Sequence, residues 1–161
     1  MNDPQPFPVW IFVLFPLFFA AVWLLVAAIL ATVGGWAELA RQYRDPGHDF
    51  RGHIVQLPGS SLSMRRGRMP FPANYKHCVT LTLPGTGLHL RVMSVFRFRH
   101  PPLFIPWGQM ERVEPGSILR WRTLTLRPAG SSTRIYLWGR TAQVVEDAWQ
   151  RHLARAQPAP A

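Results

Sequence analysis

The chain has 161 residues, 48% of them hydrophobic, and it carries 18 Lys and Arg against 8 Asp and Glu, a formal net charge of +10. This length accommodates a membrane anchor and one domain of modest size. A single cysteine excludes a fold stabilised by intrachain disulfides. So basic a chain invites a nucleic-acid role. However, all but one of the basic residues are arginine, which coding bias explains as well as selection for charge does. A domain near an anionic leaflet also gains about 1 kcal/mol per nearby basic residue. We therefore expect membrane-proximal charge, with nucleic acid an unlikely partner.

An apolar run, Val9–Val33, opens the chain, and no charged residue occurs between Asp3 and Glu38. A helix of about 25 residues is roughly 37 Å long, against a hydrocarbon core of about 30 Å. Pro16 inside the run is tolerated with a kink. The segment before the run has no basic residue, unlike a signal peptide, although small residues at the end of the run leave cleavage as an alternative. The pattern predicts a transmembrane helix over Val9–Val33.

The distribution of charge predicts the orientation of this helix. All 18 Lys and Arg residues follow the apolar run, so the positive-inside rule places the C-terminal part in the cytoplasm. Trp10 and Trp36 bracket the run, where aromatic rings favour the headgroup layer. A lone thiol, Cys78, suits a reducing compartment. We expect a single-pass protein of the inner (cytoplasmic) membrane with its N-terminus outside and its C-terminus inside.

The remaining chain divides into four segments by composition. Residues 1–8 are expected to form a short extracytoplasmic N-terminus, 34–47 a juxtamembrane helix end and linker, 48–156 the folded domain and 157–161 a disordered tail. In the second of these segments, Trp36, Leu39 and Tyr43 recur at helical spacing. This spacing predicts a last helical turn or two that continue the apolar run and lie partly in the membrane interface, before Asp45-Pro46-Gly47 ends the helix.

Alternating apolar and polar residues predict strands from residue 53 onward. The expected strands cover Ile54–Met64 with a bend at Pro58-Gly59, a hairpin over Tyr75–Met93, then Leu103–Trp107, Leu119–Arg127 and Ile135–Trp138. In the hairpin, His77 is expected to share one face of its strand with Tyr75 and Val79, whereas His89 is expected on the outer face of its strand.

A C-terminal amphipathic helix is predicted over Thr141–Arg155, with Thr141 as its N-cap. Its apolar stripe comprises Val145, Ala148, Trp149 and Leu153.

A run of short antiparallel strands closed by one amphipathic helix resembles pleckstrin-homology-like (PH-like) domains. In that fold the helix plugs one end of a partly open barrel and often points a tryptophan inward, and Trp149 occupies a matching place. The segments GLHLRV and FRFRHPPLFIPWGQMERVEP resemble the middle of bacterial and GRAM-type members. The resemblance covers residues 53–155. It implies an α+β, mainly β, protein: an N-terminal transmembrane helix followed by a partly open antiparallel barrel capped by a C-terminal helix.

In PH domains that bind phosphoinositides, the loop after the first strand carries basic residues that grip the headgroup. The resemblance places Arg65, Arg66 and Arg68 in that loop, with Lys76 on the following strand. Guanidinium groups form bidentate bonds to phosphate. The alternative is a solvated loop that lies near anionic lipid without a specific headgroup.

A second candidate site interleaves aromatic and basic residues before and after a Pro-Pro pair. It comprises Phe96, Arg97, Phe98, Arg99 and Phe104. Such a platform suits a protein interface, a membrane surface or single-stranded nucleic acid. Phe96 and Phe98 are expected to share one strand face, so an ordinary strand edge with its charges outward explains the pattern equally well.

Catalytic patterns are weak in this sequence. His48 and His53 flank Asp49, but their spacing in a Pro/Gly-rich joint is weak for a metal site. His77 and Cys78 are neighbours on a predicted strand, so they point to opposite faces. We expect no enzyme, cofactor or metal. The predicted function is a binding or assembly module at the anionic membrane surface, and the alternative is a scaffold for a protein partner in a membrane complex.

Overall fold

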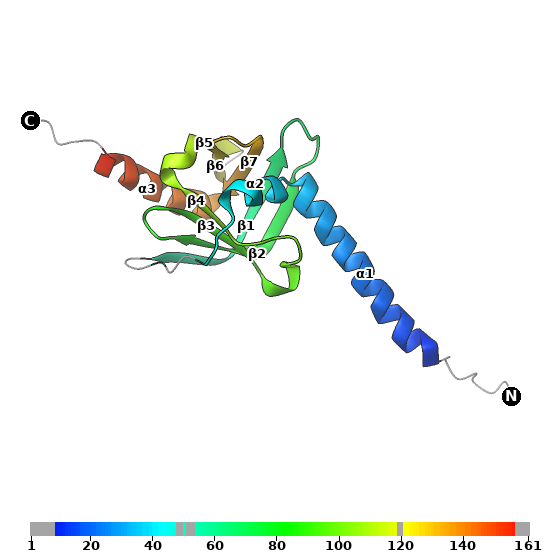
Figure 1. The fold of residues 1–161 in the computed structure, drawn as a ribbon. Helices are drawn as coiled ribbons and strands as arrows, with labels where there is room; N and C mark the ends of the chain where they lie inside the picture. Colours follow the sequence, from blue (N-terminus) through cyan, green and yellow to red (C-terminus); the bar gives the residue numbers. More distant parts are fainter. Residues whose placement is uncertain (1–8, 48–49, 51–53, 119–120, 157–161) are drawn as a thin grey trace, which may run out of the picture.

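The structure is a computed structural model that describes residues 9–47, 50, 54–118 and 121–156. A long helix projects from a domain in which a curled antiparallel sheet is flanked by two further helices (Figure 1). The helices are α1 (Val9–Val33), α2 (Trp36–Tyr43) and α3 (Gly139–Ala156). The strands are β1 (Val55–Arg66), β2 (Ala73–Leu83), β3 (Gly87–Val92), β4 (Leu103–Pro106), β5 (Met110–Ile118), β6 (Trp121–Pro128) and β7 (Thr133–Trp138). Two 3₁₀ turns, η1 (Ser94–Phe96) and η2 (Trp107–Gln109), lie on either side of β4.

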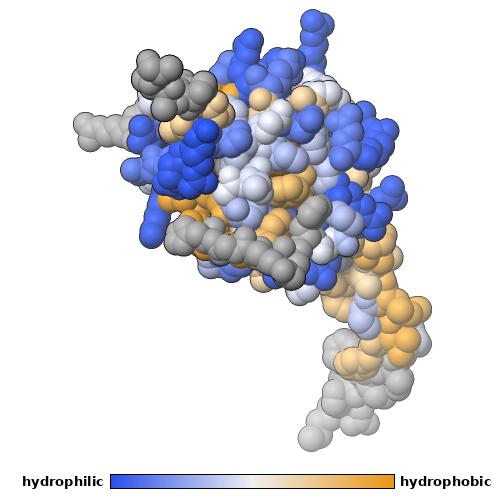
Figure 2. Space-filling view, turned by 60° about the vertical axis from the view of Figure 1, so that its left-hand side comes forward, coloured by the Kyte–Doolittle hydropathy of each residue, from blue (hydrophilic) through white to orange (hydrophobic). Residues whose placement is uncertain are grey.

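Helix α1 confirms the helix predicted over Val9–Val33 and includes Pro16. Within the part of the chain that the structure describes, it is the one helix long and apolar enough to span a membrane. Its side chains are mostly exposed because the helix leaves the domain over most of its length. Figure 2 shows hydrophobic residues along this helix, whereas hydrophilic residues dominate the visible face of the domain. The apolar surface therefore needs lipid, or another apolar partner, to cover it.

The seven strands form one antiparallel sheet in the order β4-β3-β2-β1-β7-β6-β5. β1 is central and pairs with both β2 and β7. Its register with β2 is irregular between Leu57 and Leu62, where the predicted bend at Pro58-Gly59 falls. Bulges of this kind strengthen twist and let a sheet curl around its own inner face. The curl encloses the core, and α3 packs against β6, β7 and β1.

The core consists of the inward side chains of the sheet together with residues from α2 and α3. Its largest fully buried side chains include Trp36, Leu39, Leu62, Met64, Leu81, Leu90, Trp107, Leu124 and Leu126. Ala142, Val145 and Ala148 supply the buried stripe of α3. Trp149 is only partly buried, at 5.7 Å between ring centroids from Trp107, which is itself fully buried. The α+β class and the C-terminal helix are thus as the sequence predicted.

The hairpin predicted over Tyr75–Met93 is confirmed as β2 and β3, but His77 was assigned to the wrong face. His77 has φ +53° and is exposed, whereas Tyr75 and Val79 on either side are buried. The register passes from Ser60↔Val79 to Leu62↔Tyr75, so β2 holds extra residues at this point. Such a bulge breaks the alternation on which the prediction depended.

The start of α3 and the presence of β5 also differ from the predictions. α3 begins at Gly139, directly after β7, so Thr141 lies inside the helix rather than at its N-cap. β5 was not predicted, because Pro115 and Gly116 within it disfavour strand structure. At the edge of a sheet both residues are tolerated, and β5 is the last strand in the order. The start of the strand predicted from Leu119 lies outside the described residues.

Candidate functional site at the membrane junction

Helix α2 is separate from α1 and packs into the domain, whereas the sequence predicted helical turns that continue the apolar run and lie partly in the membrane interface. Trp36 and Leu39 are fully buried and Tyr43 is nearly so. The Trp36 indole Nε1 donates a hydrogen bond to the Pro101 carbonyl at 2.9 Å, and the Tyr43 hydroxyl donates to the Ala129 carbonyl at 2.8 Å. A helix of 8 residues is marginal alone, so this packing holds it in place. Trp36 therefore cannot serve as the predicted headgroup anchor.

Three loops converge on α2 because antiparallel strands bring alternate connections to one end of the sheet. They are the β1–β2 loop (67–72), the β3–β4 loop (93–102) and the β6–β7 loop (129–132). We call this the loop end of the domain. α1 leaves the domain here, and an alanine Cβ at Gly34 would lie 2.6 Å from the Ala73 Cβ. Helix α1 is thus joined to the domain through packed residues rather than through a long free linker.

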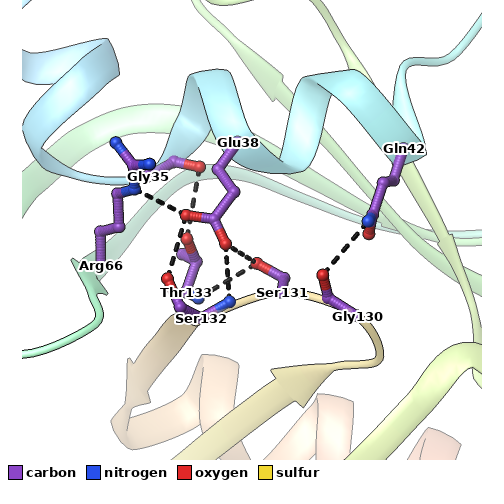
Figure 3. Close-up of polar contacts among 8 residues, drawn as sticks. All are labelled: Gly35, Glu38, Gln42, Arg66, Gly130, Ser131, Ser132 and Thr133. Atoms are coloured by element: carbon purple, nitrogen blue, oxygen red, sulfur yellow. Dashed lines mark hydrogen bonds and ion pairs between the residues drawn. The ribbon is translucent and has the colours of Figure 1, made fainter.

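Glu38 is the polar centre of this joint (Figure 3). Its carboxylate accepts hydrogen bonds from the Ser132 backbone N–H at 2.6 Å, the Ser131 hydroxyl at 2.9 Å and the Ser132 hydroxyl at 3.1 Å. The Arg66 Nε lies 2.7 Å from the same carboxylate. Burial by itself would raise the pKa of Glu38, but these donors and the Arg66 charge outweigh it, so the pKa is lowered from its usual 4.5.

We expect Glu38→Gln to weaken the joint at neutral pH and to have less effect in acid. A carboxylate with a lowered pKa stabilises the fold above its unfolded pKa, and that contribution is lost as pH falls through the folded pKa. The melting temperature in detergent should fall by about 5 °C at pH 7, as expected for loss of about 1 kcal/mol. The difference from wild type should shrink below about pH 4. Glu114→Gln, at an exposed pair with Arg112, is the control and should change little. A difference that stays constant down to pH 3 would contradict the assignment.

The β3–β4 loop touches α1 well before the C-terminal end of this helix. Phe96 packs against Trp23 in a tilted arrangement with 4.9 Å between ring centroids, and the Trp23 indole Nε1 donates to the Val95 carbonyl at 3.4 Å. Ten residues separate Trp23 from Val33, so this contact lies about 15 Å along the helix from its C-terminal end. In Figure 1 the loop lies on the side of the domain that faces the N-terminal end of α1.

A buried histidine holds this loop in shape. His100 is 2% exposed, with its Nδ1 2.9 Å from the Phe98 carbonyl and its Nε2 3.1 Å from the Tyr75 hydroxyl. Burial lowers the pKa of His100. Both contacts are satisfied by the neutral tautomer of His100 in which Nδ1–H donates to the Phe98 carbonyl and Nε2 accepts a hydrogen bond from the Tyr75 hydroxyl. The loop between Phe96 and His100 is therefore fixed from inside the domain.

The tip of the loop exposes apolar side chains beside basic ones. Val95 is 64% exposed and Met93 and Phe98 about half exposed, with Arg97 and Arg99 also exposed. The sequence placed this platform on a strand, which is wrong: residues 94–96 form η1, and Arg99 has φ +57°. The alternation F-R-F-R resembles a strand, but the chain turns here to reach β4.

The predicted platform does not form one surface. Phe96 lies against Trp23, whereas Phe104 is on β4 and packs on Phe50 with 5.5 Å between ring centroids. Arg97 and Phe98 stay together at the loop tip. The structure thus divides the platform into a loop tip beside α1 and a strand residue away from it.

The basic residues predicted to grip a headgroup point in different directions. Arg65 lies over the Tyr136 ring, 5.8 Å from its centroid, whereas the next residue, Arg66, pairs with Glu38. Arg68 is exposed in the turn after β1, and Lys76 is exposed on β2. In Figure 1 the β1–β2 loop projects from the junction on the side opposite to the direction of α1. Arg65 lines a pocket beside Tyr136 that Arg66, Arg68 and Lys76 do not line.

A pocket of about 620 Å³ lies on the outer face of β2 and β3. Its lining includes Asp45, Gly47, Phe50, Gln56, Thr80, Thr82, His89, Arg91, Arg97 and Pro102. His89 is on the outer face, as predicted, but the segment after α2 covers it, so it is 8% exposed. Its Nε2 lies 3.1 Å from the Asp45 carboxylate. Sequence reasoning missed this pair because the two residues are 44 positions apart.

Groups that could perform chemistry are sparse in this structure. In the described ranges, no cluster of three or more His, Cys, Asp and Glu could hold a metal ion. The candidate around His48, Asp49 and His53 lies outside the described residues. Burial raises the pKa of the Cys78 thiol, which disfavours the reactive thiolate.

No protein-family model matches this sequence, and no curated protein is significantly similar to it.

Proposed function

We propose that this chain is a single-pass inner-membrane protein whose PH-like cytoplasmic domain is a binding and assembly module held against the anionic membrane surface. One observation carries the proposal: the β3–β4 loop lies against Trp23, within the apolar helix, and its tip exposes Val95 and Phe98. Lipid that surrounds α1 at the level of Trp23 would also surround this tip.

The depth of the contact fits an interfacial loop. A hydrocarbon core of about 30 Å needs about 20 helical residues. If the core begins at Val9, it ends near Ala28, and Trp23 then lies about 8 Å inside the boundary. Apolar groups of interfacial segments enter the bilayer to about this depth, between 5 and 10 Å. Arg97 and Arg99 have side chains long enough to return their charges to the headgroups.

Two further features support the proposal. The 18 Lys and Arg residues all follow the apolar run, which favours a cytoplasmic domain by the positive-inside rule. The curled antiparallel sheet closed by α3, with Trp149 turned toward Trp107, is compatible with the PH-like resemblance. In this chain, however, the basic end of the first strand contacts α2 through Arg66 and Glu38. We therefore assign the membrane contact to the β3–β4 loop.

The proposal predicts that a probe at residue 95 reports lipid. Val95→Cys would be made in a Cys78→Ser background, labelled with an environment-sensitive fluorophore and reconstituted as the full chain in lipid nanodiscs. We expect nitroxides on the upper acyl chain to quench this probe at least about threefold more than a probe at Gln143→Cys, an exposed position on α3. Aqueous iodide should show the reverse order.

Equal quenching of both probes by iodide would overturn the seating of the loop on the membrane. In-cell crosslinking from the same Val95→Cys position separates the alternative function. Crosslinks to a discrete protein, without lipid quenching, would indicate the protein-partner scaffold instead. A reporter fused at the C-terminus tests the orientation, and activity confined to the periplasm would overturn it.

A further inference from the structure

The pocket on the outer face of β2 and β3 begins at the end of the domain from which α1 leaves. Arg91 is the penultimate residue of β3, which ends at Val92, and Arg97 lies in the β3–β4 loop that contacts Trp23. Both arginines line the pocket and both are exposed. The basic side of the pocket therefore lies next to the loop that we propose enters the membrane interface.

The cross-strand register sets the polar floor of this pocket. Thr80 pairs with Arg91, and Thr82 pairs with His89 and with Gln56. Directly paired residues project from the same face of a sheet, so this hydroxyl-bearing and amide-bearing surface is continuous with the Arg91 side chain. Guanidinium groups beside hydroxyl and amide donors match the oxygens of a phosphate group.

Among the described residues that line the pocket, Asp45 is the one carboxylate, and it is already engaged. One oxygen of Asp45 lies 3.1 Å from His89 Nε2, and the other accepts the Gly47 backbone N–H at 3.0 Å. No ion pair joins the Arg91 or Arg97 guanidinium to a carboxylate of the described ranges. By contrast, Arg66, Arg112, Arg122 and Arg127 each have a carboxylate partner. The two pocket arginines retain their capacity to bind an anion.

We propose that this pocket binds a phosphate group through Arg91 and Arg97, and that its position favours the headgroup of an anionic phospholipid as the source. This inference rests on the proposed function, because only a domain seated on the membrane brings the pocket to headgroup level. A headgroup that carries choline places a positive charge beside the two guanidiniums, so anionic lipids bind more tightly than zwitterionic ones.

Native mass spectrometry of the full chain in detergent tests the proposal. Phosphatidylglycerol or phosphatidylcholine is titrated into the wild-type protein, and the fraction with one bound lipid is measured. We expect wild type to bind phosphatidylglycerol about tenfold more tightly than phosphatidylcholine. A ratio of this size corresponds to the energy of one charge-assisted hydrogen bond. The double variant Arg91→Gln with Arg97→Gln should bind both lipids equally. Arg91→Gln alone should lose part of the preference, and it leaves the membrane-contacting loop unchanged.

The comparison variant removes the same charge from exposed residues elsewhere on the domain, with Arg68→Gln and Arg134→Gln combined. Neither of these side chains lines the pocket. Retention of the lipid preference in this variant supports the pocket, whereas an equal loss in both double variants would overturn it, because the charge would then act nonspecifically. Displacement of phosphatidylglycerol by micromolar glycerol phosphate, abolished by Arg91→Gln, would identify a soluble phosphate ester as the source.

Different results would overturn the phosphate site and the proposed function. A wild-type protein without any preference for phosphatidylglycerol or glycerol phosphate overturns the phosphate site, even if the Val95 probe still reports lipid. An unquenched Val95 probe overturns the membrane seating, whatever the pocket binds. Because Arg91 and Arg97 are exposed, the variants should fold, and unchanged melting temperatures would confirm this.

Discussion

Replacing Gly35 by alanine is expected to lower the free energy of unfolding of the domain by about 3 kcal/mol. Gly35 has φ +88°, a conformation that costs a residue with a side chain about 1–2 kcal/mol. A methyl group here would also overlap the Thr133 side chain, whose Cβ would lie only 3.0 Å away. Relief of this overlap would force α2 away from the β6–β7 loop, and it would take Glu38 from its partners. Thermal or urea unfolding of the full chain in detergent, followed by tryptophan circular dichroism, measures the loss.

Gly85→Ala is a matched control because Gly85 has φ +85°, and an added Cβ would meet no atom within 4 Å. It should cost only about 1 kcal/mol, from backbone conformation alone. Adding Thr133→Ala to Gly35→Ala removes two of the three overlapping atoms and should recover part of the difference. If Gly35→Ala and Gly85→Ala lower the free energy of unfolding by the same amount, the close approach of Gly35 and Thr133 does not hold α2 against the β6–β7 loop.

Trp36→Ala is expected to have the other large effect, a loss of about 3–5 kcal/mol. The indole is fully buried between Tyr75 and His100, with ring centroids at 5.5 and 5.3 Å, and it donates a hydrogen bond to Pro101. Its removal leaves a cavity and an unpaired carbonyl at the loop that contacts α1. The same unfolding measurement should show the loss, and lipid quenching of the Val95 probe should decrease because α2 no longer fixes the loop.

Trp121→Ala controls for the removal of an indole as such. Trp121 is 65% exposed, so its replacement should cost less than about 1 kcal/mol. Trp36→Phe keeps most of the buried ring and loses the hydrogen bond, so its effect should fall between the two. A Trp36→Ala variant as stable as Trp121→Ala would show that α2 is not part of the domain core, which would return Trp36 to the membrane interface.

The elements that sequence patterns predicted are those whose evidence is local. The uninterrupted apolar run of α1, the alternation in β2 and β3, and the spaced apolar residues of α3 each identify an element within a short window. The failures occurred where a distant contact changes the outcome. At His77 a bulge against β1 reverses the side-chain direction, and at β5 an edge position tolerates Pro115 and Gly116.

The arrangement of the candidate site residues could not be predicted. Phe96 lies against Trp23 of α1, whereas Arg65 and Arg66, adjacent in sequence, project to Tyr136 and to Glu38 on opposite faces of β1. A run of basic residues gives no information on which of them already has a partner. Those partners come from β7 and α2, elements far away in the chain.

By itself, the sequence determined that this protein has an apolar helix long enough to cross a bilayer, followed by an α+β domain of short antiparallel strands and a final amphipathic helix. Only the tertiary structure decided how the helix and the domain are joined. The apolar stripe of α2 suits either lipid or a protein core, and contacts with Pro101 and Ala129, more than 60 residues away, select the core. Hydrophobic periodicity specifies that a face is buried, whereas the partner that buries it depends on the whole fold.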